Sequence, residues 1–212
     1  MPIIIFDFDG VLVRSRAPDR TFIWSKNIES DLGIPMNIRD RFFEQPEWNR
    51  ILCGQGDFRT MLSELFEKHR LTIDVDAFIE YWLTKDLNWN VDVLKFAEEL
   101  KYSGHVLHIA TNQDRIRGRH IREHVKIKRL FTEVITSADV GINKPSIEFF
   151  QKLRERLLKN SSGTPVLIDD DQRNIGTAHA AGFKGIYFNP DLDPNASIES
   201  LDTALNTLLA GQ

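Results

Sequence analysis

The chain has 212 residues, of which 42% are hydrophobic and 27% are charged, and its formal net charge at pH 7 is -4. This is the balance of an ordinary globular protein with a sizeable core, and the mild acidity offers no general attraction to nucleic acid. The single cysteine, Cys53, excludes an internal disulfide. The apolar run at residues 3–6 is too short for a signal peptide or a membrane span, so we expect a cytoplasmic protein with no membrane partner.

Five short apolar runs are predicted to be buried strands, and the first, second and fourth have the near-continuous apolar composition of strands covered on both faces. They cover residues 2–6, 106–110, 133–136, 165–168 and 185–188. Apolar residues at helical spacing separate the later runs, at residues 91–102, 145–159 and 171–181. Because strands alternate with helices along the chain, we predict an α/β fold with a parallel sheet.

Residues 20–90 differ from the rest because they contain helical patterns and no convincing strand. The patterns cover residues 22–32, 38–43, 58–69 and 75–83, and all four tryptophans fall in this part of the chain. We predict a small helical subdomain with its own aromatic core, inserted after the first strand. The alternative is that one or two of its aromatic side chains line a substrate pocket. The predicted division is a core of residues 1–13 and 91–212 and a helical cap of residues 14–90.

Two carboxylates stand where the first predicted strand ends. Asp7 and Asp9 are two residues apart, and side chains at that spacing in a strand point to the same face. They therefore converge at the carboxyl edge of the sheet, where open α/β sheets place their ligands. On its own, the pair is also explained by acids that merely cap a strand end.

Polar groups also follow the second and fourth predicted strands. Thr111 and Asn112 offer groups that donate to phosphate oxygens, although such residues also cap helices. Asp169 and Asp170 begin a run of three acids that repel one another unless a cation lies among them, and oxygen ligands favour magnesium. Lys144 precedes a helix, whose dipole does not favour a cation there, so we expect an anionic ligand or a carboxylate cluster to hold it.

The order of these residues resembles the haloacid dehalogenase-like (HAD) hydrolase superfamily over nearly the whole chain. Residues 7–11 (Asp-Phe-Asp-Gly-Val) are similar to its first motif, and the second, third and fourth are matched by Thr111, Lys144 and the pair Asp169-Asp170. The long interval between the first two motifs leaves room for a helical cap. The resemblance implies a doubly wound, five-stranded parallel sheet in the spatial order 5-4-1-2-3.

The resemblance also implies catalytic roles. Asp7 would attack phosphorus and become an aspartyl phosphate, while Asp9 would protonate the leaving oxygen and later deprotonate the attacking water. For that work the pKa of Asp9 would lie above its free value of about 3.9, raised by nearby like charges. Lys144 would offset the charge of the transferring phosphoryl group.

The implied cofactor is a Mg2+ ion. The residues implied to hold it are Asp7, the main-chain carbonyl of Asp9, and Asp170, with Asp169 close by. Thr111 and the amide of Asn112 would bind the phosphoryl oxygens.

We expect a magnesium-dependent phosphatase that hydrolyses a small phosphorylated metabolite. An acid at Asp9 favours phosphatases over true dehalogenases, because a halide leaving group needs no proton. The alternatives are a sugar-phosphate mutase or a haloacid dehalogenase on the same scaffold, a phosphonate-cleaving enzyme that uses Lys26, a binding protein with a vestigial site, and a nucleic-acid end phosphatase. Only the basic stretch at residues 114–129 suggests the last, so we do not expect a nucleic-acid partner. The sequence predicts neither the physiological substrate nor the oligomeric state.

Two parts of the cap are open to two interpretations. Arg14 and Arg16 either bind a second anionic group of the substrate or are surface residues of a hinge. Residues 51–57 form either a loop that reaches the active site or a simple turn between helices.

Overall fold

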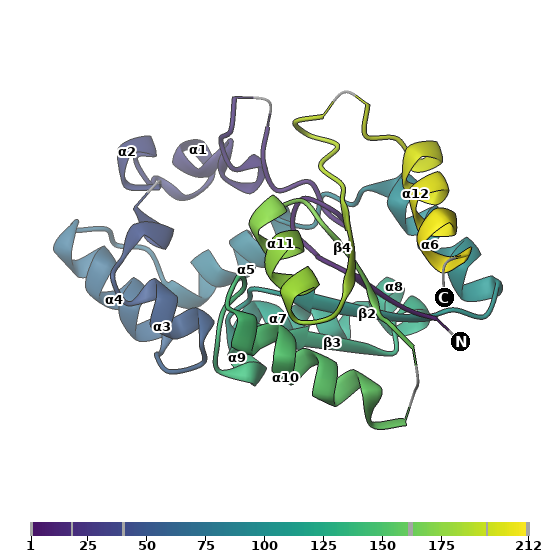
Figure 1. Ribbon diagram of the computed structural model, residues 1–212. Coiled ribbons are helices and arrows are strands. Elements are labelled where there is room, and N and C mark those ends of the chain that lie inside the picture. Colours follow the sequence, from purple (N-terminus) through teal and green to yellow (C-terminus); the bar gives the residue numbers. More distant parts are fainter. Residues whose placement is uncertain (1, 18, 40, 161–162, 194, 211–212) are drawn as a thin grey trace.

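The protein is built on one five-stranded parallel sheet. The computed structural model describes residues 2–17, 19–39, 41–160, 163–193 and 195–210. The strands are β1 (Ile3–Phe6), β2 (Val106–Thr111), β3 (Glu133–Thr136), β4 (Val166–Asp169) and β5 (Lys184–Tyr187). Their spatial order is β3-β2-β1-β4-β5, which confirms the predicted order, read from the opposite edge (Figure 1).

Helices cover both faces of the sheet, which explains why the strands are almost continuously apolar. Ile4 and Phe6 face one apolar cluster, and Ile3 and Ile5 face another. The first cluster packs under α6 (Val91–Tyr102), α7 (Arg115–Glu123), α8 (Val125–Leu130) and α12 (Ile198–Ala210). The second packs under α10 (Ile147–Leu157) and α11 (Gln172–Ala180), while α9 (Ser137–Val140) follows β3 and η3 (Leu158–Asn160) follows α10.

A group of short helices lies beside the carboxyl edge of the sheet, on the left in Figure 1. Its elements are η1 (Ile23–Ser25), α1 (Ile28–Leu32), α2 (Met36–Arg39), η2 (Phe42–Glu44), α3 (Trp48–Leu52), α4 (Phe58–Lys68) and α5 (Val75–Lys85). Aspartates start the two longest: Asp57 accepts from the N–H of Thr60 at 2.8 Å, and Asp74 from that of Ala77 at 2.9 Å.

These helices share an aromatic core of their own. Phe42 and Phe78 are fully buried with ring centroids 4.7 Å apart, and Trp24 and Trp82 belong to the same cluster. Trp89 does not, because it packs against Phe8 of the sheet domain at 5.9 Å. We call this group the cap, and the boundary at residues 14–90 stays a prediction.

The two connections between cap and sheet lie side by side. Val13 forms an antiparallel bridge with Trp89. The N–H of Arg14 donates to the carbonyl of Asn88 at 2.8 Å, and the N–H of Asn90 donates to that of Leu12 at 2.9 Å. The cap is therefore joined to the core by a short double connection that begins only a few residues after Asp7.

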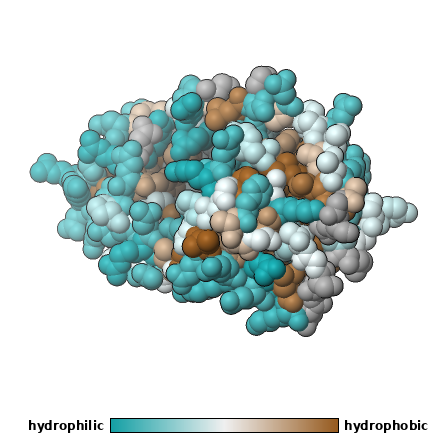
Figure 2. Space-filling view, in the orientation of Figure 1, coloured by the Kyte–Doolittle hydropathy of each residue, from teal (hydrophilic) through white to brown (hydrophobic). Residues whose placement is uncertain are grey.

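The basic stretch at residues 114–129 forms two helices. The chain is extended at His124 (φ -66°, ψ 131°), which ends α7 and starts α8. The chain also forms α12, α9 and α3, which we did not predict. None of the helices in the described ranges is both long and apolar enough to cross a membrane. Figure 2 shows a face that is largely hydrophilic over the cap, with apolar side chains in small separate patches.

Candidate active site

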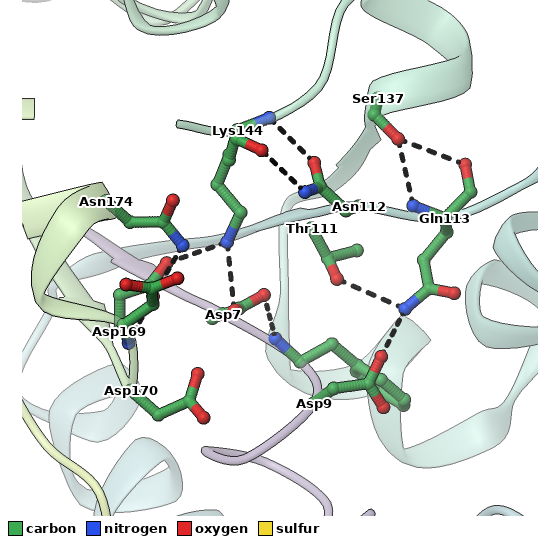
Figure 3. A network of polar contacts seen from close by, with 12 residues as sticks. Asp7, Asp9, Thr111, Asn112, Gln113, Ser137, Lys144, Asp169, Asp170 and Asn174 are labelled. Atoms are coloured by element: carbon green, nitrogen blue, oxygen red, sulfur yellow. Dashed lines mark hydrogen bonds and ion pairs between the residues drawn. The ribbon is translucent and has the colours of Figure 1, made fainter. Parts of the chain in front are cut away.

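Asp7 is the first residue after β1 and is held on both oxygens. The N–H of Phe8 donates to its Oδ1 at 2.7 Å, and Lys144 Nζ lies 2.9 Å from its Oδ2 (Figure 3). Burial raises the pKa of Asp7 well above its usual value, Lys144 opposes this, and the nearby charges of Asp169 and Asp170 add to it. Asp7 thus carries a carboxylate whose negative charge needs cations close by.

Lys144 is buried at the centre of the site. Its Nζ lies 2.7 Å from Asp169 Oδ2 as well as 2.9 Å from Asp7. Burial lowers its pKa, but the charges of Asp169 and Asp7 outweigh this and raise it above the usual range. A carboxylate cluster therefore holds this lysine, as the sequence led us to expect.

The side chain of Asn112 fixes the loop that carries Lys144. Its Nδ2 donates to the carbonyl of Lys144 at 2.9 Å, and its Oδ1 accepts from the N–H of Lys144 at 2.8 Å. We expected the amide of Asn112 to bind phosphate, but the side-chain amide is engaged with the main chain. Contact with phosphate through its main-chain N–H stays a prediction. Thr111, at the end of β2, is buried but lines the cavity described below.

Three carboxylates form a cluster that suits a metal ion. Asp7, Asp169 and Asp170 each offer an oxygen, and these oxygens lie within 4.8 Å of one another. Asp169 already has three donors, because besides Lys144 it accepts from the N–H of Asp171 at 2.9 Å and from Asn174 Nδ2 at 2.8 Å. These contacts fix its carboxylate beside Lys144.

Asp170 is the free member of the cluster. Burial and the charge of Asp169 raise its pKa to about 7. Gly10, whose φ is +81°, lets the first loop pass close to it, since a Cβ there would lie 2.2 Å from Asp170 Oδ2. Two carboxylates with raised pKa values and oxygen-only ligands fit a hard divalent cation such as magnesium.

Asp9 makes contacts that the sequence did not lead us to expect. Its Oδ2 accepts from Arg117 Nη1 at 2.6 Å and from Gln113 Nε2 at 2.6 Å, and its Oδ1 accepts from Arg117 Nη2 at 2.7 Å. Burial raises the pKa of Asp9, but the charge and hydrogen bonds of Arg117, with help from Gln113, outweigh it and hold this pKa below the usual value. Our expectation of a raised pKa is wrong for this conformation, because the guanidinium of Arg117 stabilises the charged form of Asp9.

Arg117 also reaches the cap. Its Nη2 lies 2.7 Å from Asp86 Oδ2, at the end of α5. Burial raises the pKa of Asp86 to about 7, Arg117 lowers it, and Asp9 raises it. One buried cation thus pairs with two carboxylates, Asp9 from the core and Asp86 from the end of α5 in the cap. Asp86 carries no motif, and nothing in the sequence marked it.

Half of the other basic side chains of residues 114–129 are neutralised within the molecule. Arg119 pairs with Glu123 at 2.9 Å, and two further ion pairs join Arg122 to Asp139 and Arg129 to Glu98. This stretch therefore offers fewer free charges to a nucleic acid than its sequence suggests.

The site opens into a cavity of about 500 Å3, which we call the polar cavity. The predicted residues that line it are Asp7, Asp9, Thr111, Asn112, Lys144 and Asp170. Arg16 and Arg20 line its outer part, whereas Lys26 does not line it. Arg14 lies 3.8 Å from Asp191, and the guanidinium of Arg16 stacks 3.9 Å from the Phe22 ring centroid.

The loop at residues 51–57 packs on the core. Arg115 Nη2 donates to the carbonyl of Gly54 at 3.3 Å, and a Cβ on Gly54 would lie 2.6 Å from the carbonyl of Ala138. None of its residues lines the polar cavity, but Leu52 lines a second cavity that also contains Asp9, so both interpretations stay open.

A sequence profile of haloacid dehalogenase-like hydrolases matches residues 1–182. The chain belongs to this family. It is 28% identical over 193 residues to the sesquiterpene phosphatase astK of Aspergillus oryzae, covering 89% of this chain and 90% of that protein.

Solved structures share the HAD fold with this chain. The HAD family enzyme bt-2542 of Bacteroides thetaiotaomicron, in complex with magnesium and inorganic phosphate, has a TM-score of 0.72 at 15% identity and covers 95% of this chain and 98% of its own. The L-2-haloacid dehalogenase PA0810 has a TM-score of 0.67 at 21% identity, over 93% of this chain and 89% of its own. The structures that share this fold therefore include a haloacid dehalogenase.

Proposed function

We propose that the protein is a magnesium-dependent phosphatase that hydrolyses a small phosphate monoester through an aspartyl phosphate on Asp7. The observation that carries the proposal is the arrangement of Asp7, Lys144, Asp170 and Asp9 around one cavity at the carboxyl edge of the sheet. The phosphatase relative supports it, because that protein matches this chain over nearly its full length.

The chemistry needs two steps on Asp7. In the first, a carboxylate oxygen of Asp7 attacks phosphorus, the bond from phosphorus to the ester oxygen breaks, and the alcohol leaves with a proton from Asp9. In the second, Asp9 takes a proton from water, the water oxygen attacks phosphorus, and the bond to Asp7 breaks. Phosphate leaves, and both carboxyl groups return to their starting states.

Cations near Asp7 make these steps feasible. Lys144 holds Asp7 and faces the incoming phosphoryl oxygens, whose charge it offsets. Asp7, Asp170 and the main-chain carbonyl of Asp9 are the groups that would bind magnesium, which supplies further charge neutralisation at the phosphoryl group. Asp169 orients Lys144 through its 2.7 Å contact.

Asp9 has to be protonated in the first step and charged in the second. The contact with Arg117 favours the charged form of Asp9, which is the form that the second step of the proposed reaction uses. The first step requires Asp9 to leave the guanidinium. Asp86 then remains beside Arg117 and keeps its charge neutralised.

Asp9 also separates the phosphatase from the dehalogenases of the same fold. A halide leaves without a proton, whereas the oxygen of an alcohol needs one. Asp9 lines the cavity beside Asp7, as a leaving-group acid requires.

The proposal is tested with p-nitrophenyl phosphate, with and without magnesium. We expect hydrolysis by the parent only with magnesium and none by Asp7→Asn. The matched control is Asp92→Asn, an exposed aspartate in the first turn of α6, which should retain full activity. A folded parent that releases phosphate from neither this ester nor a broad panel of monoesters would contradict the proposal.

A further inference from the structure

A second cavity of about 330 Å3 lies between the cap and the core. Its apolar lining consists of Phe22, Trp24, Phe43, Trp48, Leu52 and Trp82, and we call it the aromatic cavity. Asp9, Ser15, Arg16 and Asn112 line both this cavity and the polar one. The two cavities are therefore neighbours, and Asp9 belongs to the wall of both.

The aromatic wall is held in place by its own packing. The Phe43 ring lies 4.8 Å from Trp48, 5.6 Å from Trp82 and 5.5 Å from Phe22, measured between centroids. Yet Phe22, Phe43 and Trp48 are only half-buried, whereas Phe42 in the same core is fully buried. Half-buried rings around a shared space are the lining typical of a pocket for an apolar ligand.

The position of Asp9 fixes which part of a substrate points into this cavity. In phosphoryl transfer the attacking and leaving oxygens lie roughly in line on opposite sides of phosphorus. Asp7 is the attacking group in the proposed function, and Asp9 protonates the leaving oxygen. The carbon chain on that oxygen therefore starts at Asp9, where the aromatic cavity begins.

We propose that the aromatic cavity binds the alcohol part of the substrate, so that the substrate is the phosphate monoester of a lipophilic alcohol. This rests on the proposed function and names its substrate class. An apolar cavity of roughly 150 Å3 holds a benzene molecule, so this cavity holds roughly ten to fifteen carbon atoms. At the polar end of the cavity, Arg117 pairs with both Asp86 and Asp9, so its charge is neutralised within the protein.

The test is a series of alkyl monophosphates, from ethyl through butyl and octyl to decyl phosphate, assayed for phosphate release with magnesium. We expect kcat/KM to rise about fourfold for each added methylene until the cavity is full. Leu52→Trp fills the cavity from the end of α3. It should lower kcat/KM for decyl phosphate at least tenfold, and by a much larger factor than it lowers kcat/KM for ethyl phosphate.

Leu83→Trp is the matched control, because Leu83 packs at the edge of the same aromatic core but does not line the cavity. This variant should keep the preference for long chains. Equal kcat/KM along the series would overturn the inference while leaving the phosphatase intact, and so would a preference for nucleoside monophosphates over decyl phosphate.

Failure of the proposed function gives a different result, which is no hydrolysis of any ester. Calorimetric titration with decylphosphonate and ethylphosphonate then tests independently whether the aromatic cavity binds an apolar chain. Tighter binding of decylphosphonate with a more negative heat-capacity change, lost in Leu52→Trp, supports an apolar site. Equal binding of the two phosphonates rejects it.

Discussion

Asp9 illustrates how one neighbour decides the chemistry of a residue. The guanidinium of Arg117 occupies both oxygens of its carboxylate and keeps it charged. In the proposed reaction the same group has to donate a proton and then accept one. Whether Asp9 acts as an acid or as a base therefore depends on the group that it contacts in each step.

Asp9→Asn separates these two steps when the leaving group needs no acid. Nitrophenolate leaves readily without a proton, so we expect the variant to release about one equivalent of it per enzyme in a rapid burst. The later steady-state rate should fall by about 10²–10⁴, because no base activates water. Stopped-flow absorbance measures both phases.

An alkyl phosphate is the internal control for this variant, since its leaving oxygen needs a proton and no burst should appear. A steady state as fast as that of the parent would show that Asp9 is not the base.

At the residue scale, the sequence predicted which side chains surround the polar cavity. Asp7 and Thr111 lie at or directly after strand ends, and the parallel sheet brings such ends to one edge. It did not predict which partner each side chain takes. Asn112 bonds a main chain and Asp9 bonds Arg117, because those contacts depend on loop geometry that no motif encodes.

The contact between α5 and α7 is the main element-scale feature that the sequence did not reveal. Arg117 lies in the first turns of α7, where Asp114 caps the helix and accepts from the N–H of Ile116 at 2.7 Å. From there it joins Asp86, after α5, to Asp9, after β1. A helix of the core, the end of the cap and the catalytic loop thus share one cation.

Removing that cation leaves the buried carboxylate of Asp86 and the partly buried carboxylate of Asp9 without a positive partner. We expect Arg117→Met to lower the free energy of unfolding by about 3–5 kcal/mol, measured by urea denaturation. Adding Asp86→Asn should recover part of this loss, because only one uncompensated charge then remains buried. Arg119→Met is the control, since Arg119 is exposed, and should change stability by less than about 1 kcal/mol. If the double variant lost as much free energy of unfolding as the two single variants together, the shared pairing of Arg117 would be refuted.

Asp86 also makes stability depend on pH. Its folded pKa of about 7 lies above the unfolded value of about 3.9, so between these values the folded state binds more protons. The free energy of unfolding therefore falls with rising pH, by at most about 1.4 kcal/mol per unit from this group, and levels off above about pH 7. Asp86→Asn removes that slope.

Urea denaturation of the parent and of Asp86→Asn at several pH values between about 5 and 8 measures this difference. The stability of the variant relative to the parent should grow with pH across that range. A constant difference would mean that Asp86 is charged throughout.

Sequence periodicity predicted the strands better than the helices. The five strands lie within one or two residues of the apolar runs, because burial on both faces makes them continuous. The basic stretch divides at His124, where α8 starts with its own cap, since the His124 side chain accepts from the N–H of Lys126. The pattern of α12 was present, with Leu201 and Leu205 buried one turn apart, so that helix was predictable.

At the scale of the whole molecule, the cap and the core meet over the site. The cap contributes the aromatic wall, and the core contributes the carboxylates and Lys144. Composition predicted the aromatic core of the cap. The aromatic side chains of the cap also form a wall beside Asp9. This second role depends on how the cap helices sit over the sheet, and the sequence left open whether these side chains line a pocket.

A metal that binds only the folded carboxylate cluster stabilises the whole molecule. At about a hundred times its Kd, magnesium should add about 2.7 kcal/mol to the free energy of unfolding, seen as a rise in Tm. Asp170→Asn should be more stable than the parent without magnesium, because it removes a repelling charge, and should show little rise with it. Asp171→Asn loses a helix cap but should keep the response. Equal responses of Asp170→Asn and the parent would place the metal elsewhere.

The most direct measurement of the central claim is to trap the covalent intermediate. The enzyme is mixed with a phosphate ester and magnesium, quenched, and reduced with borohydride, which converts an acyl phosphate to an alcohol. Peptide mass spectrometry should then find homoserine in place of Asp7, and only in samples that received the ester. Reduction at another residue would contradict an aspartyl phosphate at Asp7. The absence of any reduced residue would also contradict it, provided that the parent turns over the ester and Asp7→Asn does not.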